Sequence, residues 1–587
     1  MSADPKVLLA DLLRTALRSV APDHADTPIQ LERPKQADHG DFASNLALQL
    51  AKALKRNPRQ LASALLAELP PSPAVAKAEV AGAGFINFTL ASAMKTAVVT
   101  EVLARGADFG RGAARKASVQ VEFVSANPTG PLHVGHGRGA AYGASLSDLL
   151  EFAGYSVARE YYVNDAGRQM DILALSTWLR YLALFGIDID FPPNAYQGDY
   201  VVAMARDLRD AHQDRFARVS AAELLAGTPG LPPAERGDDE AGRQREAHLD
   251  ALIANARALL GADYRWVHGF ALNEQLGDGR ADLQEFGVRF DKWFSEQSLF
   301  DTGLVERAVA QLESRGHIYL QDGAKWFRST SFGDEKDRVV QRENGMYTYF
   351  ASDIAYHLNK YERGFDRIID VWGADHHGYI ARVRGAVAAL GLPPEKLEVA
   401  LVQFAVLYRD GQKTSMSTRA GEFVTLRQLR NDVGNDACRF FYVLRKSDQH
   451  LDFDLDLARS QSNENPVYYV QYAHARVCSV LAQWGGEVAE LAGVKLDALA
   501  NERELALCAR IADFPELVQA AAADLAPHQL AFYLKDLAGD FHGWYNAERM
   551  LVDEEETRLA RLALAAAVRQ VLANALGLLG VSAPASM

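Results

Sequence analysis

A strand, a turn and a helix follow one another in residues 119–152, and this stretch constrains the fold more than any other. Apolar side chains alternate along 119–124, which predicts a strand over 119–126. Prolines and glycines in 127–131 indicate a turn, and helical periodicity runs from about residue 136 to 152. The amino end of a helix presents unpaired N–H groups and the positive end of the helix dipole. The stretch therefore predicts a nucleotide-phosphate site on a strand–turn–helix unit.

Two histidines, His133 and His136, stand at the start of this helix and share one face of it. We interpret them as phosphate contacts. Zinc binding is one alternative, although no glutamate follows His133 as in the H-E-x-x-H motif and no cysteine is near. Burial in a core is another, although glycine and proline surround the pair instead of an apolar stripe. Gly135, Gly137 and Gly139 are expected to leave room for a bulky ligand beside the backbone.

The middle of the chain is predicted to be a parallel α/β sheet, which binds ligands at the carboxyl ends of its strands. A second strand over 156–163 ends at a polar Asn-Asp-Ala-Gly loop, and a third over 366–372 ends at Gly373, Asp375 and His376.

An apolar run over 399–407 is followed by a polar loop, 413–421, that carries two cations. Residues 170–345 are helix-rich in pattern and are expected to form an insertion between two halves of the sheet.

Separate domains are predicted on either side, because 587 residues are too many for a single hydrophobic core. The N-terminal part should hold helices over 7–20 and 46–56 and a strand over 81–90. The C-terminal part should be a bundle whose Ala- and Leu-rich helices span 504–525, 527–549 and 557–579. Residues 460–587 carry nine Lys or Arg and sixteen Asp or Glu, so this bundle is acidic.

Composition excludes a few classes of protein. The net charge of −14 argues mildly against unselective coating of nucleic acid. No stretch reaches the roughly 20 apolar residues of a membrane span, and the amino terminus lacks a signal-peptide pattern. Cys438, Cys478 and Cys508 are far apart and form no C-x-x-C pair. We therefore expect a cytoplasmic protein without membrane contact and without a metal site of its own.

Several short motifs resemble those of the class I aminoacyl-tRNA synthetases. Residues 127–137, NPTGPLHVGHG, look like the HIGH signature of this class, and 415–419, SMSTR, stand where the class carries KMSKS. Further stretches resemble the bacterial arginyl-tRNA synthetases in particular: 39–45 (HGDFASN), 80–88 (VAGAGFINF), 161–167 (YYVNDAG), 334–338 (DEKDR) and 578–584 (LLGVSAP). The HxGH motif alone would also fit a small nucleotidyltransferase, but the motifs follow the family's order along the chain.

The resemblance implies an α+β N-terminal tRNA-contact domain (1–112), a Rossmann-type parallel-sheet catalytic domain (113–455) with a helical insertion at about 170–345, and an all-α anticodon-binding bundle (456–587). It implies that L-arginine reacts with ATP to give arginyl-adenylate and pyrophosphate, and that arginine then passes to the 3′ end of tRNA(Arg). Mg²⁺ is expected with ATP. The family usually works as a monomer and needs tRNA to activate arginine.

Substrate carboxylate is the nucleophile in the first step, so the protein is expected to act by positioning and by stabilising phosphate charge. His133 and His136 are the expected hydrogen-bond donors. Asp375 is expected at the ribose hydroxyls of ATP, with a surface carboxylate as the alternative. The other ATP-binding residues that the resemblance implies are Asn127, Pro128, Thr129, Gly130, Pro131, Leu132, Val134, Gly135, Gly137, Gly373, His376, Met416 and Ser417.

The second signature loop departs from the family pattern. Ser415 and Thr418 stand at its two lysine positions. Lys413 and Arg419 are the nearby cations, and we predict that they take the catalytic role at the leaving pyrophosphate.

Selectivity for arginine requires carboxylates, because the guanidinium fork pairs with them through two parallel hydrogen bonds. By resemblance, Glu296 and Asp353 are the candidates, with Tyr349 packing nearby. Ser125 and Asn127 are expected to hold the amino-acid head group. A surface position is the alternative for both carboxylates.

Aromatic side chains of the bundle are candidates for stacking on unpaired tRNA bases, the usual way of recognising RNA loops. Tyr472 and Trp544 are the predicted stacking residues, and Arg476 and Arg549 the predicted local cations. Aromatic residues at helical spacing are more often part of a core.

Other functions remain open from the sequence. A class I synthetase for glutamate should place cations in the amino-acid pocket, and one for cysteine should carry a thiol-binding zinc site. A catalytically silent paralogue that binds tRNA is the alternative outside catalysis.

Overall fold

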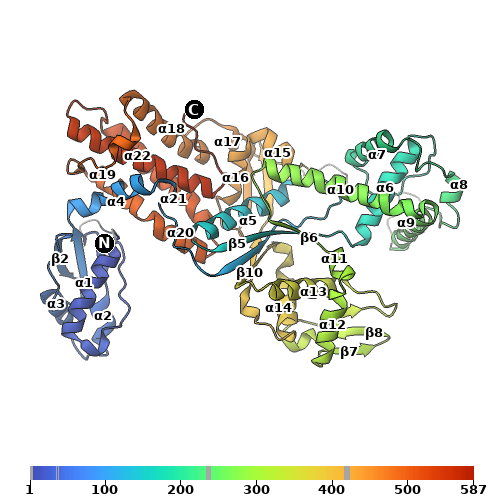
Figure 1. The fold of residues 1–587 in the computed structure, drawn as a ribbon, viewed down its shortest axis with the longest axis horizontal. Helices are drawn as coiled ribbons and strands as arrows, with labels where there is room; N and C mark the ends of the chain where they lie inside the picture. Colours follow the sequence, from blue (N-terminus) through green and yellow to red (C-terminus); the bar gives the residue numbers. More distant parts are fainter. Residues whose placement is uncertain (1–3, 35, 37–38, 233–238, 415–423) are drawn as a thin grey trace.

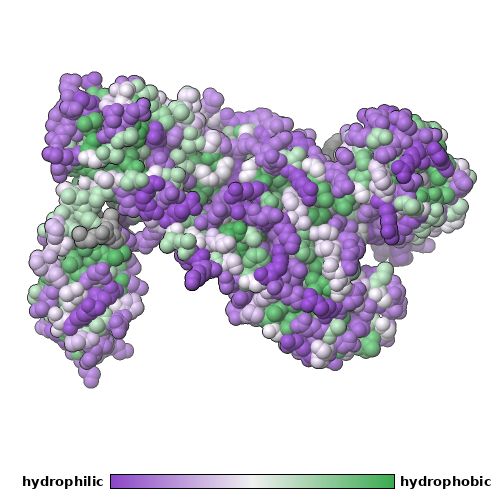
Figure 2. Space-filling model, in the orientation of Figure 1, coloured by the Kyte–Doolittle hydropathy of each residue, from purple (hydrophilic) through white to green (hydrophobic). Residues whose placement is uncertain are grey.

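The computed structural model describes residues 4–34, 36, 39–232, 239–414 and 424–587. Figure 1 shows an N-terminal domain (blue) that hangs from the C-terminal helices (red), a central sheet, and a helical insertion (green) at the far end of the molecule. Figure 2 shows open space between the N-terminal domain and the central part, and a mainly hydrophilic surface on this face of the insertion.

The N-terminal domain packs helices against an antiparallel sheet of order β1-β3-β2. Its elements are α1 (Pro5–Val20), β1 (Phe42–Ser44), α2 (Leu46–Ala51), α3 (Pro58–Ala67), β2 (Val75–Ala81) and β3 (Phe85–Leu90), and α4 (Ser92–Arg105) leads onward. The strand predicted over 81–90 is confirmed only from residue 85, because Ala81 ends the preceding strand. Gly82 and Gly84, at φ +53° and +136°, turn the chain between β2 and β3, a backbone conformation that favours glycine.

A five-stranded parallel sheet of order β11-β10-β4-β5-β6 lies at the centre, as predicted. Its strands are β4 (Ser118–Glu122), β5 (Ser156–Val163), β6 (Lys292–Ser295), β10 (Arg367–Gly373) and β11 (Leu397–Val402). The chain runs from β4 to β5 on one side and returns to β10 on the other, so the strand order reverses at β4. Ligands of such sheets bind outside the carboxyl ends of the strands at this point.

Helix α5 (Val134–Phe152) packs on β4 and begins two residues earlier than predicted. Its small residues allow a close approach to the sheet, since a Cβ at Gly143 would lie 2.3 Å from the Phe123 ring. The other helices beside the sheet are α13 (Tyr349–Glu362) and α14 (Ile380–Ala389).

The part of the predicted insertion up to residue 285 contains helices and no strand among its described residues, whereas strands and helices alternate beyond it. It comprises α6 (Arg168–Ala183), α7 (Asp199–His212), α8 (Ala221–Leu224), α9 (Asp239–Leu260) and α10 (Ala262–Glu285), which share a hydrophobic core. The chain then rejoins the central sheet as β6. The segment up to α13 holds α11 (Gln297–Asp301), α12 (Leu304–Ser314) and the antiparallel strands β7 (Ile318–Gln321), β8 (Ala324–Phe327) and β9 (Arg338–Gln341). Helical periodicity did not predict these strands.

The apolar run 399–407 also belongs to two strands, the end of β11 and the start of β12 (Ala405–Arg409). Strand β12 forms a small sheet with β13 (Gln412–Lys413) and β14 (Leu451–Asp454).

The C-terminal part is helical, as predicted. Its elements are α15 (Leu426–Val433), α16 (Asn435–Val443), α17 (Leu455–Arg459), α18 (Pro466–Trp484), α19 (Glu502–Ala512), α20 (Phe514–Ala523), α21 (His528–Ala547) and α22 (Glu555–Leu578). Among the described residues, α22 is the one helix long and apolar enough to cross a membrane, and 67% of its apolar window is buried inside the structure. It forms the centre of the bundle.

Candidate active site

The carboxyl edge of the central sheet gathers most of the predicted site residues. The turn after β4 carries Ser125 and Asn127, Glu296 follows β6 directly, and Asp375 follows β10. The amino end of α5, with both histidines, lies at the same edge. One edge of one sheet therefore brings together residues that are up to 250 positions apart in the sequence.

The turn between β4 and α5 has a strained backbone. Val124 and Ser125 adopt φ values of +69° and +41°, which L-residues rarely adopt and β-branched residues avoid. The Ser125 hydroxyl donates to Glu122 Oε1 at 2.8 Å and accepts from the Tyr162 N–H at 3.1 Å. Neighbouring strands thus hold the turn in a conformation that the isolated chain would not keep, a feature that clusters at functional sites.

His133 and His136 cap the amino end of α5 with their own rings. The Nδ1 atom of His133 accepts from the Gly135 N–H at 3.1 Å, and Nδ1 of His136 accepts from the His133 N–H at 3.3 Å. Both rings must therefore carry their proton on Nε2. The rings stack with centroids 3.6 Å apart.

Burial keeps both histidines uncharged at neutral pH. It lowers the pKa of His133, and burial together with the His133 charge lowers the pKa of His136 to about 3. The pair therefore offers two N–H donors and no net charge. Charge stabilisation must come from the helix dipole and from cations elsewhere.

The segment after the second signature loop lies directly against the histidine segment. The Val134 N–H donates to the Val424 carbonyl at 3.2 Å, and the Leu426 N–H donates to the Leu132 carbonyl at 2.8 Å. These bonds make His133 and Thr425 antiparallel partners. The described segment that follows the second motif is thus a neighbour of the first motif in space.

Lys413, the first predicted cation of that loop, is exposed at the end of β13. The other predicted residues of the loop, Met416, Ser417 and Arg419, lie outside the described residues, and their roles stay predictions.

Three predicted ATP contacts point into protein instead. Leu132 and Val134 bury their side chains, with 4% and 1% of their surface exposed. A Cβ at Gly137 would lie 2.8 Å from both Leu426 Cδ1 and the Tyr442 hydroxyl. The space beside Gly137 therefore serves helix packing, which corrects the expectation of room for a ligand. Nothing lies within 4 Å of a Cβ at Gly139.

Arg138 was not predicted and anchors this edge of the site. It is 1% exposed, and its guanidinium donates to the carbonyls of Gln403 and Gln449, both at 2.7 Å. Burial lowers its pKa to about 10. Arg138 thereby ties α5 to the connection between β11 and β12, where Phe404 is 47% exposed beside Gly135. An arginine inside a helix of small residues was the only signal for it.

Glu296 and Asp353 form a buried acidic pair. They are 6% and 7% exposed, so the surface alternative is wrong for both. Glu296 accepts from the Ser352 hydroxyl at 2.8 Å, and Asp353 accepts from the Tyr379 hydroxyl. Burial raises the pKa of Glu296; burial, with Glu296 adding to it, raises that of Asp353 to about 7. Within the described part of the chain, neither forms an ion pair with lysine or arginine.

Tyrosines surround this pair. Tyr349 is 62% exposed, yet it lies close enough to Asp353 for that carboxylate to raise the pKa of its hydroxyl. Tyr379 was not predicted, and no sequence signal pointed to it. A buried, cation-free acidic pair lined by aromatic rings is a chemical match for a guanidinium group.

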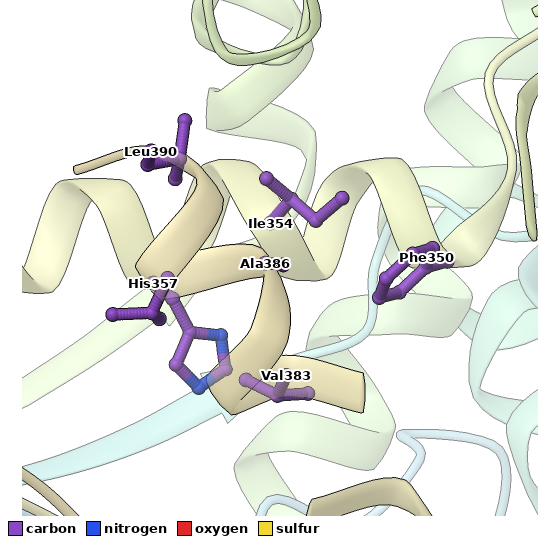
Figure 3. A pocket seen from close by; sticks show the side chains of 7 residues that line it. Phe350, Ile354, His357, Val383, Ala386 and Leu390 are labelled. Carbon is purple, nitrogen blue, oxygen red and sulfur yellow. The ribbon is translucent and has the colours of Figure 1, made fainter. Parts of the chain in front are cut away.

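A layer of buried charged side chains, formed by Glu122, His357, Lys360 and Asp370, lies next to the acidic pair. Lys360 is fully buried and donates to Glu122 at 2.5 Å and to Asp370 at 2.6 Å. His357 bridges Asp370, at 2.9 Å from Nε2, and the Asp353 carbonyl, at 2.8 Å from Nδ1. Burial alone would raise the pKa of Asp370, but Lys360 and His357 hold it at about 2. Figure 3 shows His357 among the apolar side chains of α13 and α14.

Asp375 and His376 lie on the surface side of the site. Each side chain is 58% exposed, and Asp375 pairs with His376 at 3.3 Å. A Cβ at Gly373 would lie 2.4 Å from Asp375 Oδ1, the end of an exposed side chain that has room to turn away. Among the described residues, no cluster of three or more histidines, cysteines or carboxylates could hold a metal ion.

The predicted tRNA contacts of the bundle divide into two groups. Arg476 stacks between the rings of Tyr472 and Tyr545, at 4.4 and 4.7 Å from their centroids. Arg549 is exposed. Trp544, in contrast, is fully buried, so it belongs to the core and cannot stack on a base.

The N-terminal domain contains a hollow of about 480 Å³. Arg33, Asn45, Phe85 and Asn87 are among its lining residues, and Phe85 is 41% exposed. The sequence singled out residues 39–45 and 80–88, and the fold places them together at this hollow.

Three family models match the chain in succession. Residues 8–90 match the arginyl tRNA synthetase N terminal domain, residues 98–181 and 280–449 match the tRNA synthetases class I (R) catalytic domain, and residues 470–587 match the DALR anticodon binding domain. The fold and the site together define a class I aminoacyl-tRNA synthetase.

Similarity to curated relatives identifies the family within this class. Arginine–tRNA ligases of Azoarcus sp. (strain BH72) and Aromatoleum aromaticum are 83% and 80% identical, covering 100% of this chain and of their own. The chain belongs to the arginine–tRNA ligase family, also called arginyl-tRNA synthetases. The Thermus thermophilus arginyl-tRNA synthetase structure is similar with a TM-score of 0.73 at 25% identity, covering 99% of this chain and 100% of that one.

Proposed function

We propose that this chain is an arginine–tRNA ligase that works in two steps. An oxygen of the arginine carboxylate attacks the α-phosphorus of ATP, which forms arginyl-adenylate and releases pyrophosphate. A hydroxyl of the terminal tRNA ribose then attacks the arginyl carbonyl, which forms the ester and releases AMP. The single observation that carries the proposal is the buried acidic pair, Glu296 and Asp353, which has no lysine or arginine partner among the residues that the structure describes.

Arginine supplies the cation that this acidic pair lacks. A buried carboxylate without a partner is unfavourable, whereas a guanidinium offers each one a charge-assisted hydrogen bond. Tyr349 lies where it can cover the guanidinium plane. We expect Ser125 and Asn127, in the strained turn after β4, to hold the amino-acid head group. A pocket specific for glutamate would require lysine or arginine in place of Glu296 and Asp353.

ATP binds along the amino end of α5. His133 and His136 donate through Nε2–H to phosphate oxygens, and the turn 127–131 presents backbone groups beside them. Gly373, Asp375 and His376 contact the ribose and adenine side. Lys413 and Arg419, with Met416 and Ser417 between them, bring the second loop to the leaving pyrophosphate.

The tRNA contacts two separate surfaces in this proposal. Tyr472, Arg476 and Arg549 of the bundle bind the anticodon region, and the half-buried stack of Arg476 between two tyrosine rings supports this role. The hollow around Phe85 and Asn87 receives an unpaired base elsewhere on the tRNA, since an exposed ring with amides beside it suits stacking and base-edge hydrogen bonds.

Mg²⁺ would accompany ATP as part of the substrate, where it would neutralise phosphate charge. We further propose that the protein acts as a cytoplasmic monomer without membrane contact, and that tRNA is required for arginine activation.

Arginine-dependent ATP–pyrophosphate exchange, with and without tRNA(Arg), tests the proposal. We expect exchange with L-arginine and not with L-citrulline, which has the same shape without the charge, or with L-lysine or L-glutamate. Exchange supported by another amino acid would overturn the arginine assignment. Retained tRNA binding without any exchange would indicate a silent paralogue.

A further inference from the structure

The helical insertion touches the turn that precedes His133. The Tyr200 hydroxyl donates to the Thr129 carbonyl at 2.7 Å, and a Cβ at Gly130 would lie 3.3 Å from the same hydroxyl. Tyr196 also reaches the Thr129 side chain. The turn predicted to bind ATP therefore rests on two side chains from another part of the molecule.

Both tyrosines are fixed inside the insertion. The Tyr196 N–H donates to the Ser176 hydroxyl of α6 at 3.1 Å. Tyr196 and Tyr200 pack against a cluster contributed by α6, α7 and α10. A displacement of these helices would therefore move the Thr129 carbonyl with them.

On another side of the insertion, α10 forms ion pairs with α15, the helix that follows the second signature loop. On α10, Asp278 pairs with Arg427 of α15 at 2.8 Å, and Asp282 accepts from Arg430 Nε at 3.1 Å. Arg430 also pairs with Glu285 at 2.7 Å. Asp282 and Arg430 are 2% and 7% exposed, so this contact is part of the packed interior. Helix α15 begins two residues after Val424, which pairs with the histidine segment.

We propose that the helical insertion is a bracket that fixes both ATP-handling segments relative to one another, with Tyr200 and Asp282 as its positioning residues. Tyr200 sets the turn at Thr129, and Asp282 sets α15 and hence Val424, which follows the second loop. The inference rests on the proposed ATP site. The class I catalytic family model leaves residues 182–279 unmatched, so it assigns no role to Tyr200.

The bracket explains how a chain that lacks the signature lysines still aligns the phosphates. Alignment of reacting groups to within a fraction of an ångström is a large part of the rate in such reactions. Loss of one hydrogen bond at the turn should therefore alter ATP affinity and adenylate formation without changing the arginine pocket.

The test compares Tyr200→Phe and Asp282→Asn with a matched control, Tyr264→Phe. The Tyr264 hydroxyl donates to Asp171 at 2.8 Å within the insertion and does not reach the turn. Calorimetric titration of each full-length variant with Mg²⁺-ATP, without arginine or tRNA, gives the Kd. We expect about three- to tenfold weaker binding for Tyr200→Phe and Asp282→Asn, and a Kd within about twofold of wild type for the control.

Kinetics separate positioning from general destabilisation. In pyrophosphate exchange we expect Tyr200→Phe to raise the KM for ATP by about the same factor and to leave the KM for arginine within about twofold. Thermal unfolding checks that each variant folds. If Asp282→Asn does not fold, the comparison of the Kd values of Tyr200→Phe and Tyr264→Phe still tests the bracket.

A Tyr200→Phe protein that folds and binds ATP as tightly as the control would overturn the bracket. Absence of ATP binding to the wild type would overturn it as well. Wild-type ATP binding without arginine-dependent exchange would overturn the proposed function, while the comparison of Kd values would still decide the bracket.

Discussion

In the proposed arginine pocket, Asp353 is expected to make binding depend on pH. Burial, with a contribution from Glu296, raises the pKa of Asp353 to about 7. Below this pH the carboxyl is protonated and uncharged, whereas the arginine guanidinium stays charged throughout. Binding at low pH must therefore first remove a proton. We expect the KM for arginine to rise about tenfold per pH unit well below pH 7 and to level off above about pH 8.

The measurement is pyrophosphate exchange at several arginine concentrations between pH 5.5 and 9. Asp353→Asn should raise the KM for arginine about 10- to 100-fold, as loss of a charge-assisted hydrogen bond does. It should also flatten the profile. A profile that Asp353→Asn leaves unchanged would assign the titration to another group.

His136 is expected to act as a donor and not as a cation. Its pKa of about 3 keeps it uncharged throughout the assay range of about pH 5.5 to 9. His136→Ala removes the Nε2–H donor and should lower the kcat of exchange about 100- to 1,000-fold. His136→Gln keeps an N–H group and should recover part of that loss. Equal losses in both variants, with unchanged thermal unfolding, would contradict the donor role.

Motifs predicted which residues gather at the site, and they could not predict what each atom does. His133, His136, Glu296 and Asp353 were found in the sequence. The Nδ1 bonds of the histidines depend on backbone N–H positions, which no motif states. Trp544 was misassigned because periodicity cannot tell the core face of a helix in a bundle from a face that binds RNA.

At the scale of elements, Lys360 holds strands β4 and β10 and helix α13 together. It is fully buried between Glu122 and Asp370. Lys360→Met would leave both carboxylates without their cation in the interior. Breaking a buried pair in this way typically costs about 3–5 kcal/mol. We expect a loss of that size in the unfolding free energy, measured by urea denaturation.

Lys325→Met is the matched control for this experiment. Lys325 pairs with Glu313 at 2.8 Å, and its side chain is 29% exposed. Loss of such a surface pair should cost less than about 1 kcal/mol. Equal effects of the two substitutions would refute the structural role of the buried layer. The sequence could not predict this layer, because residues 122, 360 and 370 come from separate elements.

Long, uniform elements were predicted well and short ones were not. The strand at 156–163 has the predicted bounds, and α1 and α21 are close to prediction. The run 504–525 breaks at Asp513, ahead of a proline near the start of α20, and the four-residue strands β7 to β9 are too short for a period to be recognised. Hydrogen bonding between neighbouring strands in the folded protein, and not the local preference of the sequence, stabilises these strands.

At the scale of the whole molecule, the proposed function needs surfaces from three separate parts. The residues proposed to bind ATP and arginine lie at the edge of the central sheet. The residues proposed to contact tRNA lie on the N-terminal domain and on the bundle. The order of these parts was predictable from the motifs. Their relative placement was not, because it depends on side-chain contacts between residues several hundred positions apart.

Two ion pairs join the N-terminal domain to the bundle. Arg33 pairs with Asp513 at 2.7 Å, and Lys6 pairs with Glu516. Their side chains are 30–65% exposed, so these pairs are weak and sensitive to salt. We expect the N-terminal domain to move away from the bundle at high ionic strength.

Small-angle X-ray scattering without tRNA measures this motion. The radius of gyration of the wild type should increase between 50 and 500 mM NaCl. Asp513→Asn with Glu516→Gln should show the larger radius already at 50 mM, since both changes remove charge from the bundle side and leave the hollow at Phe85 intact. The same double variant should raise the KM for tRNA about two- to fivefold and leave ATP affinity unchanged. A radius that neither salt nor the double variant alters would mean that apolar packing, and not these ion pairs, fixes the domain.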